Sequence, residues 1–474
     1  MRCYAVAEWA KYRIFAVRVI STTTTAMSND DIIRLYDLFL LCEGVTTDSR
    51  NIVGGELFVA LKGEHFDGNR FAEEALQKGA RYAVVSDEAV ARASDRCYYV
   101  ADTTEALGRL AYHHRSRCAI PLLLITGTNG KTTTKELVAA VLAQKYKVHY
   151  TTGNLNNHIG LPLTLLQLRP EHEIAVVEAG ASHRGEIDYL AKIADPDYGI
   201  ITNIGRAHLE AFGSYQGVID TKTELYDYLL HRSGTAFVCA DDALLMRLSA
   251  PVNRLLYGAA TVSSGEKLLA CGHLSLSSQL ATLTVDLLTP REMTIATHLV
   301  GGYNLPNVLA AVAVGLHFGV ALEDIAKALR AYMPDNHRSQ LIGPTARGNL
   351  LVADVYNANP SSMQEAVQNI LHTPSKQGKL LLLGDMLELG VQSEEEHRKV
   401  VDMLVESQAL YEKVMFAGPQ FYALRGAYTE LKPLAFYSDK TSLQQHLQEE
   451  PITGKMLLLK ASHGMHFETL IENL

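Results

Sequence analysis

The residues between 126 and 136 have the types and spacing of a loop that holds phosphate groups. The apolar run Pro121–Ile125 indicates a short buried strand, and it leads through Gly127 and Gly130 into a helix that opens at Lys131. Glycines let the backbone curl so that its N–H groups point inward, and the helix start adds the positive end of its dipole. Lys131 can then reach the terminal phosphates, and the Thr132 hydroxyl can hold Mg²⁺. The loop therefore predicts a nucleoside triphosphate as the energy source. The residues that we expect to contact this nucleotide on the loop are Gly127, Thr128, Asn129, Gly130, Lys131, Thr132 and Thr133.

The spacing is a shortened variant of the usual phosphate loop. The usual loop has a glycine five residues before Gly130, where this chain has Ile125. The alternative is an ordinary glycine turn between a strand and a helix, with Lys131 in solvent. The order of strand, turn, Lys-Thr pair and helix favours the phosphate loop.

Polar residues also follow several of the other apolar strands. Glu178 ends the run Ile174–Glu178, His208 follows the next strand at Gly199–Asn203, and Asp354 ends a later strand. Open α/β sheets bind ligands at the carboxyl ends of their strands, so Glu178 is placed to bind the Mg²⁺ of a nucleotide and Asp354 to accept hydrogen bonds from a ribose. The alternatives are a glutamate in solvent and a structural histidine. Two such residues after successive strands favour a shared site.

Two further signals are weak by themselves. Lys222 lies in Asp220–Glu224, which we expect at the start of a helix, and most lysines of that kind lie on the surface. Asn357 and Asn359 follow Asp354, and they could simply cap the next helix.

The composition limits the class of protein. Of the 474 residues, 43 are Lys or Arg and 52 are Asp or Glu, which gives a net charge of −9 and argues against nucleic acid as a partner. The six cysteines lie far apart without a CxxC pair, which favours a reducing cytoplasm over disulfides or a zinc site. We expect no membrane insertion, because no apolar run approaches the length of a membrane span.

The elements that must position these residues alternate between strands and helices. This alternation predicts an α/β fold with parallel sheets. We expect three domains: a small N-terminal α/β domain at 27–115, a central phosphate-loop domain with a parallel sheet at 116–333, and a C-terminal Rossmann-like domain at 334–474. An antiparallel appendage is expected from about 260 to 300, and a last helix at Gly464–Glu472. No GxGxxG follows a strand of the C-terminal series, which argues against a nicotinamide cofactor there.

The first 26 residues do not fit this pattern. Charged residues interrupt their apolar stretch, unlike in a signal peptide, and Met27 followed by Ser28 looks like a natural beginning with a helix cap. We expect 1–26 to be a disordered leader or a start-site artefact.

From about Gly44 onward, the chain resembles the Mur ligases. The phosphate loop marks the wider family, which includes folylpolyglutamate synthases. Three further strings are similar to the branch that adds D-alanyl-D-alanine: Asn156–Pro162 (NNHIGLP), Tyr356–Pro360 (YNANP) and Gly384–Gly390 (GDMLELG). The DNPR string of a sister ligase that selects diaminopimelate is absent.

The resemblance implies roles for individual residues. It implies that Lys222 becomes carbamylated, which would turn a cation into an anion that helps to bind a second Mg²⁺. The other implied metal ligands are Thr132, Glu178 and His208. The implied ATP contacts outside the loop are Asn304, Asn307, Asp354 and, at the γ-phosphate, Arg338. The implied contacts with the other substrate are Asp48, Ser49, Arg50, Asn154 and Asn157.

The resemblance also implies the reaction. An ATP-dependent, ADP-forming ligase of the bacterial cytoplasm would join UDP-MurNAc-tripeptide and D-Ala-D-Ala through an acyl phosphate, with Lys131, Lys222, His208 and Arg338 as the catalytic groups. We expect a monomer. The alternatives are a sister Mur ligase or folylpolyglutamate synthase with another acceptor, a simple kinase or NTPase, and a scaffold that only binds nucleotide.

The chain departs from the family pattern at three places. Ala179 replaces a common methionine, and Tyr303 replaces a frequent histidine. Ala461–Gly464 reads Ala-Ser-His-Gly where the branch usually has Gly-Ser-Arg-Gly, which puts the way the C-terminal domain holds the peptide in doubt. None of these departures touches the phosphate or metal groups.

Overall fold

A computed structural model describes residues 27–63, 65–206, 209–259, 266–275, 282–334, 338–428, 430–431 and 433–474. The chain separates into two compact units. The first holds the described residues up to Leu124 together with Tyr146–Ala181 and Gly185–Tyr198, and the second holds Ile125–Lys145, Ser182–Arg184 and Gly199–Leu474. The expected leader, residues 1–26, lies outside the described residues.

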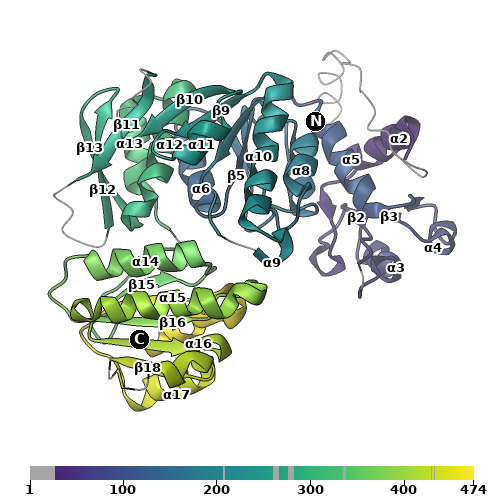
Figure 1. Cartoon of the computed structure of the whole chain (residues 1–474). Helices are drawn as coiled ribbons and strands as arrows, with labels where there is room; N and C mark the ends of the chain where they lie inside the picture. The colour runs from purple at the N-terminus through teal and green to yellow at the C-terminus, as the bar shows by residue number, and fades with distance from the viewer. Residues whose placement is uncertain are drawn as a thin grey trace. The chain divides into compact units, whose positions relative to one another are not determined.

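The first unit contains a small parallel sheet with helices around it (Figure 1). Helix α2 begins after Ser28, as expected, because Ser28 and Asp31 form a reciprocal capping box. The sheet order is β1-β2-β3-β4, and the core beneath it includes Phe58, Ala83 and Val85. The strands of this sheet are β1 (Val45–Thr46), β2 (Leu57–Val59), β3 (Tyr82–Val85) and β4 (Cys97–Tyr99). The helices are α2 (Asn29–Leu40), α3 (Ala72–Gln77), α4 (Glu88–Arg92) and α5 (Thr103–Arg115).

The same unit also contains a second group of elements. Strand β6 pairs in parallel with β7, and every residue of β7 is buried. These elements are β6 (Val148–Tyr150), α7 (Gly160–Leu165), β7 (Ile174–Glu178) and α8 (Glu186–Ala194). Strand β5 (Leu122–Thr126) runs out of this unit into the second, where α6 (Lys131–Leu142) follows it.

The second unit is built on a long mixed sheet in the order β18-β17-β16-β19-β15-β14-β13-β12-β11-β10-β9-β8. Strands β9 to β11 are parallel, and β11 to β13 are antiparallel, which confirms the expected appendage. The strands of this part are β8 (Tyr198–Ile201), β9 (Thr235–Cys239), β10 (Asn253–Gly258), β11 (Leu268–Leu274), β12 (Thr282–Thr289) and β13 (Met293–Val300). The helices are α9 (Leu209–Phe212), α10 (Tyr215–Arg232), α11 (Ala243–Leu248), α12 (Leu305–His317) and α13 (Leu322–Ala331).

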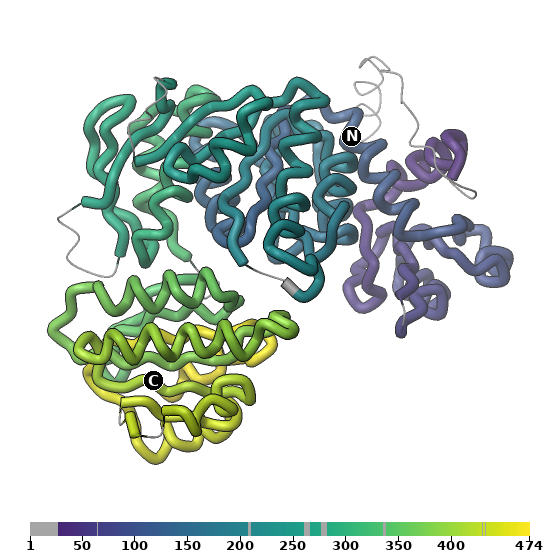
Figure 2. Tube along the Cα trace, viewed as in Figure 1, coloured from purple at the N-terminus to yellow at the C-terminus, as the bar shows by residue number. Residues whose placement is uncertain are grey.

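The C-terminal part has the doubly wound pattern that the sequence predicts. Helices α14, α15 and α16 pack on one face of its parallel strands, and α17 packs on the other. The last strand, β19, lies between β15 and β16, so the end of the chain returns into the middle of the sheet (Figure 2). The strands are β14 (Gln340–Ile342), β15 (Leu350–Asp354), β16 (Lys379–Gly384), β17 (Lys413–Ala417), β18 (Leu434–Tyr437) and β19 (Met456–Lys460). The helices are α14 (Pro360–His372), α15 (Ser393–Glu406), α16 (Pro419–Leu424) and α17 (Lys440–Glu449).

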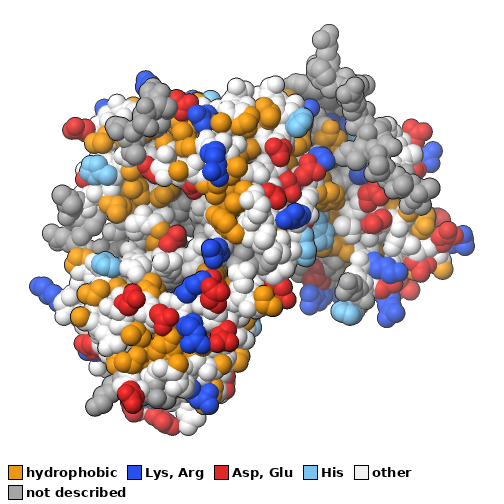
Figure 3. Space-filling model, viewed as in Figure 1, with side chains coloured by type: hydrophobic (Ala, Val, Ile, Leu, Met, Phe, Trp, Pro, Cys, Tyr) orange, Lys and Arg blue, Asp and Glu red, His pale blue; other side chains and the backbone are white. Residues whose placement is uncertain are grey.

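The surface has no obvious sorting of charge on the face drawn in Figure 3, where acidic and basic side chains of the described residues are interspersed. Within the described part of the chain, no helix combines the length and apolar character needed to cross a bilayer.

Candidate active site

The phosphate loop has the backbone geometry that its sequence predicts. Gly127 has a φ of 141° and Gly130 a φ of 77°. Residues other than glycine rarely adopt these positive backbone angles. A Cβ atom on Gly127 would overlap Thr202 Oγ1, and one on Gly130 would lie 2.8 Å from Asn307 Oδ1. Lys131 Nζ lies 2.9 Å from the Gly127 carbonyl and 3.0 Å from that of Thr128, so the lysine ammonium lies over the loop itself and not in bulk solvent.

The segment after β8 supports this loop. The Thr128 N–H donates to the Asn203 carbonyl at 3.0 Å, and the Asn129 N–H donates to Asn203 Oδ1 at 3.0 Å. The Gly205 N–H donates to Thr128 Oγ1 at 2.9 Å. The strand-end segment that was expected on the ligand edge therefore touches the phosphate loop directly. His208, which was expected on the same segment, lies outside the described residues.

Asn304 and Asn307, which were expected to contact ATP from outside the loop, lie at the start of α12 and are both buried. Asn307 Nδ2 donates to Asn304 Oδ1 at 2.8 Å, and Thr134 Oγ1, on α6, donates to Asn307 Oδ1 at 3.1 Å. Together with the close approach of Asn307 to Gly130, these bonds place the asparagine pair against the phosphate loop.

Glu178 ends β7 and only 1% of it is exposed. Asn156 Nδ2 donates to Glu178 Oε1 at 2.8 Å, and the Glu178 N–H donates to Thr151 Oγ1 at 3.0 Å. The structure therefore excludes the alternative of a solvent-exposed glutamate. No role was predicted for Asn156, although this residue opens the family string Asn156–Pro162. The local sequence could not reveal its contact, because Glu178 lies 22 residues away along the chain.

Asn154 and Asn157, which were expected to contact substrate, are both exposed. Asn157 Oδ1 accepts hydrogen bonds from the N–H groups of Ile159 and Gly160, at 3.0 and 2.9 Å, so it also helps to start α7. Asn154 lies on the same exposed segment. A substrate role for both side chains stays a prediction.

Lys222 was expected at the start of a helix, and this prediction is wrong. Helix α10 begins at Tyr215, because Ser214 caps it by accepting the Gly217 N–H, so Lys222 falls in the interior of the helix. Only 3% of Lys222 is exposed, and its Nζ lies 6.0 Å from the centroid of the Phe212 ring. A lysine is rarely buried to this degree, so the alternative of an ordinary surface lysine is wrong.

The predicted ligands suit a hard divalent cation in their chemistry. Glu178 and Thr132 offer oxygen atoms, which Mg²⁺ prefers, and both residues are buried. Glu178 belongs to the first unit, whereas Thr132 and Lys222 belong to the second. Within the described part of the chain, no three His, Cys, Asp or Glu side chains gather as a metal cluster. Magnesium sites at nucleotides commonly use only one or two carboxylates together with the phosphates.

The predicted ribose acceptor, Asp354, ends β15 and is paired with a lysine that sequence reasoning missed. Lys460 Nζ, at the end of β19, lies 2.6 Å from Asp354 Oδ2 and 3.2 Å from the Asn357 carbonyl. Only 1% of Lys460 is exposed. The pair holds the Asp354 carboxylate at the carboxyl edge of the sheet. Among the described residues the ion pair uses Oδ2, and Oδ1 is the oxygen that would accept a hydrogen bond from a ribose.

Arg338 lies on the ring of Tyr356, with its guanidinium carbon 3.3 Å from the ring centroid. His463, one of the departures from the family pattern, also stacks on Tyr356, with 5.6 Å between the ring centroids. Within the described residues, the buried Nε atom of Arg338 has no hydrogen-bond partner. An unpartnered buried donor is the kind of group that a phosphate oxygen would satisfy.

Asp48, Ser49 and Arg50, which were expected to contact the other substrate, lie in the first unit. Asp48 caps a short 3₁₀ helix, Ser49–Asn51, by accepting the Arg50 N–H, and it forms a 2.7 Å ion pair with the Arg50 guanidinium. Hydrogen bonds from Arg50 lower the pKa of the Asp48 carboxyl to about 2. Asp48 is therefore ionised at neutral pH and orients the exposed Arg50 side chain.

Family models match three consecutive parts of the chain. The model described as "Mur ligase family, catalytic domain" matches residues 42–115, "Mur ligase middle domain" matches 125–315, and "Mur ligase, glutamate ligase domain" matches 337–463. The UDP-N-acetylmuramoyl-tripeptide–D-alanyl-D-alanine ligase of Bacillus subtilis is 36% identical over 435 residues, which are 91% of this chain and 93% of that protein.

The chain belongs to the Mur ligase family. A second relative of this family, the Escherichia coli ligase of the same name, is 34% identical and covers 91% of this chain and 93% of that protein. Among solved structures, MurF from Acinetobacter baumannii superimposes with a TM-score of 0.78 at 33% identity, with 91% of this chain and 93% of that chain covered. MurF of Thermotoga maritima, solved in complex with ADP, gives a TM-score of 0.77 at 28% identity, with 92% and 97% covered.

These comparisons confirm the predicted family, the α/β fold class and the enzyme class, which is an ATP-dependent ligase. The predicted domain boundaries and the roles of individual site residues stay predictions.

Proposed function

We propose that this Mur ligase joins D-alanyl-D-alanine to UDP-N-acetylmuramoyl-tripeptide. The products would be UDP-MurNAc-pentapeptide, ADP and phosphate, in the cytoplasmic synthesis of peptidoglycan precursors. The observation that carries the proposal is the match, over nine-tenths of both chains, to ligases named for these two substrates. A sister ligase with another acceptor is not favoured by these relatives.

The chemistry follows from the inertness of a carboxylate, which is a poor electrophile in water. In the proposed route, a carboxylate oxygen of the tripeptide attacks the γ-phosphorus of ATP and ADP leaves. The N–H groups of the loop, Lys131 and Arg338 stabilise the charge that spreads over the phosphoryl oxygens. The amine of D-alanyl-D-alanine then adds to the carbonyl carbon of the acyl phosphate, loses a proton, and inorganic phosphate leaves as the amide forms.

The residues proposed to hold Mg²⁺ are Thr132, Glu178, His208 and Lys222, the last as a carbamate. When bound, Mg²⁺ would neutralise charge on the phosphates. The burial of Lys222 supports the carbamate, because a lysine must be neutral to react with CO₂ and a low-dielectric environment favours the neutral amine. The mass of the intact protein tests this modification of Lys222. The mass should exceed that of the unmodified chain by one CO₂, and the excess should be lost on acidification.

The proposed organisation has a UDP-substrate domain at 27–115, a central ATP-binding domain at 116–333 and a C-terminal domain at 334–474. Asp48, Ser49, Arg50, Asn154 and Asn157 would contact the UDP-substrate. The protein would act as a monomer, which analytical ultracentrifugation tests.

One ligation assay separates the candidate functions. The purified protein is given UDP-MurNAc-tripeptide, ATP and Mg²⁺ with D-Ala-D-Ala, glutamate, lysine or diaminopimelate. We expect an amide product and ADP only with D-Ala-D-Ala. ADP release that needs no acceptor would indicate a simple NTPase, and a product with another acceptor would indicate a sister ligase.

The acyl phosphate has its own test. With ¹⁸O in the terminal carboxylate of the tripeptide, one labelled oxygen should appear in the released phosphate, because that oxygen forms the bond to the γ-phosphorus. Unlabelled phosphate in a reaction that yields amide would refute the proposed route.

A further inference from the structure

Asn359 connects the first turn of α14 with the phosphate loop. Its Oδ1 accepts the Ser362 N–H at 2.9 Å, and its Nδ2 donates to Asn129 Oδ1 at 2.8 Å. Only 7% of Asn359 is exposed. From its sequence, Asn359 could simply have capped the helix. The structure confirms the cap and adds a contact 230 residues away along the chain.

The helix cap decides which way the Asn359 carboxamide points. The Ser362 N–H can bond only to an acceptor, so Oδ1 must face the helix and the NH₂ group must face Asn129. A donor at this place requires an acceptor from Asn129, so Oδ1 of Asn129 faces Asn359. The Nδ2 group of Asn129 then points away from Asn359 and is the end of this side chain that can donate to a ligand.

The rest of Asn129 is held by other bonds. Its N–H donates to Asn203 Oδ1, and its carbonyl accepts hydrogen bonds from Thr202 Oγ1 at 2.6 Å and Asn203 Nδ2 at 3.1 Å. The backbone of Asn129 is therefore fixed, and the orientation of its side-chain amide is what Asn359 determines.

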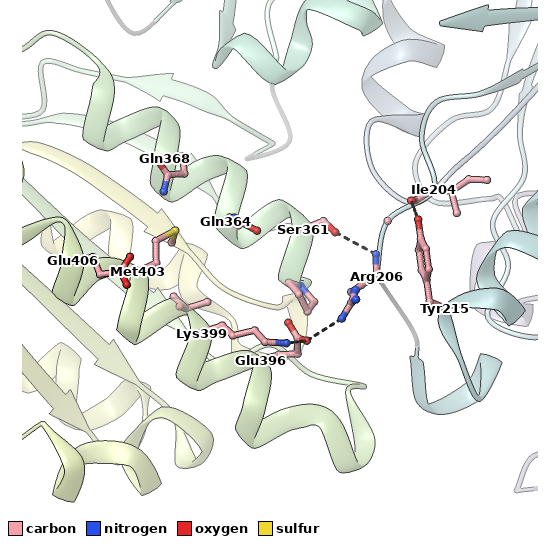
Figure 4. Close-up of a pocket in the computed structure, with 13 residues that line it drawn as sticks. Ile204, Arg206, Tyr215, Ser361, Gln364, Gln368, Glu396, Lys399, Met403 and Glu406 are labelled. Carbon is pink, nitrogen blue, oxygen red and sulfur yellow. Dashed lines mark hydrogen bonds and ion pairs between the residues drawn. The ribbon is translucent and has the colours of Figure 1, made fainter. Parts of the chain in front are cut away.

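The segment that carries Asn359 is itself anchored on both sides. Ser361 Oγ accepts the Arg206 N–H at 3.2 Å, at one end of a cavity of about 840 Å³ (Figure 4). Ser462 Oγ donates to the Ala358 carbonyl at 3.2 Å, and Lys460 holds the preceding Asn357 carbonyl. A rigid segment can impose an orientation on its partner, whereas a mobile one would adapt to it.

We propose that Asn359 is a positioning residue for the nucleotide, which orients the Asn129 carboxamide so that its NH₂ group, and not its oxygen, faces the phosphates of ATP. The inference rests on the proposed use of the loop for ATP. A flipped Asn129 amide would present an acceptor to an anion, which is repulsive.

The test compares two variants that keep the helix cap. Serine and aspartate cap helices about as well as asparagine. Asn359→Ser therefore keeps the cap, but its side chain is too short to reach Asn129. Asn359→Asp also keeps the cap and reaches Asn129 with an acceptor, which would draw Nδ2 of Asn129 away from the nucleotide. Binding of ADP and ATP is measured by calorimetry, without acceptor substrate, and KM and kcat are measured in the ligation assay.

We expect Asn359→Ser to weaken nucleotide binding about fivefold, which corresponds to the loss of one hydrogen bond, and Asn359→Asp to weaken it further. The KM for ATP should rise while the KM for D-Ala-D-Ala stays unchanged. In a double-mutant cycle with Asn129→Ala, the two effects should not add, because both act on the same contact.

The matched control is Ser362→Ala, which removes the other half of the capping box and leaves the Asn129 contact in place. It should lower the unfolding midpoint without changing nucleotide affinity. Unchanged nucleotide affinity in Asn359→Ser, or an equal loss in Ser362→Ala, would overturn the proposal. A wild-type protein that binds ATP but forms no amide would instead refute the proposed function and leave this inference standing.

Discussion

Two buried histidines of the first unit should make its stability depend on pH. His114 Nε2 lies 3.1 Å from the Leu168 carbonyl and its Nδ1 lies 3.3 Å from the Tyr36 hydroxyl, and His149 Nε2 lies 2.7 Å from the Thr164 carbonyl. Burial lowers the pKa of each imidazole to about 4, from a usual value of 6.5.

The sign follows from proton binding. Between pH 6.5 and about 4, the unfolded chain protonates these imidazoles and the folded chain does not, so the free energy of unfolding falls as the pH falls through this range. At about pH 5 the loss is about 2 kcal/mol for each histidine and about 4 kcal/mol for the pair, relative to about pH 7.5. Asp48 contributes little in this range, since the stabilisation that follows from its lowered pKa is lost only below its usual pKa of 3.8.

The assay is urea unfolding followed by circular dichroism at the two pH values, for the wild type and for the double variant His114→Gln, His149→Gln. Glutamine keeps an N–H donor for each carbonyl but does not titrate. Between about pH 7.5 and about pH 5, the free energy of unfolding should fall by about 4 kcal/mol less in the variant than in the wild type. An equal loss in both proteins would refute the reasoning, because the pH dependence would then come from other groups.

Three further predictions concern the candidate active site. Lys131→Ala should lower the ligation rate by roughly a hundredfold or more, because it removes a cation from the developing phosphoryl charge; a steady-state assay of ADP release checks this, and near-normal turnover would contradict the assigned role. Glu178→Gln keeps an oxygen that can accept from Asn156 but removes a negative charge. When the ligation rate is titrated with Mg²⁺, this variant should need more Mg²⁺ for its half-maximal rate. An unchanged midpoint would exclude Glu178 as a ligand. Lys460→Met leaves Asp354 without its buried partner and should lower the free energy of unfolding by about 3–5 kcal/mol in a denaturant series, more than Lys460→Arg does.

The sequence alone determined the features that depend on neighbouring residues. The phosphate loop was predictable because glycines are needed at the positive φ angles of Gly127 and Gly130, and the start of α2 because Ser28 caps it. The continuous apolar runs predicted β7 with the bounds that the structure has. The expected helix at Gly464–Glu472 is wrong in type: two 3₁₀ helices replace it, separated at His466, which has a φ of 52°.

Only the tertiary structure decided which distant residues meet. The burial of Lys222, the pairing of Lys460 with Asp354 and the contact of Asn359 with Asn129 have no signal in the local sequence. The physical reason is that periodicity, capping and steric rules depend on residues a few positions apart, whereas these contacts depend on the order of strands in the sheet and on which helix faces pack together. The backbone geometry of the phosphate loop could therefore be predicted from the sequence, and the long-range contacts that support the loop could not.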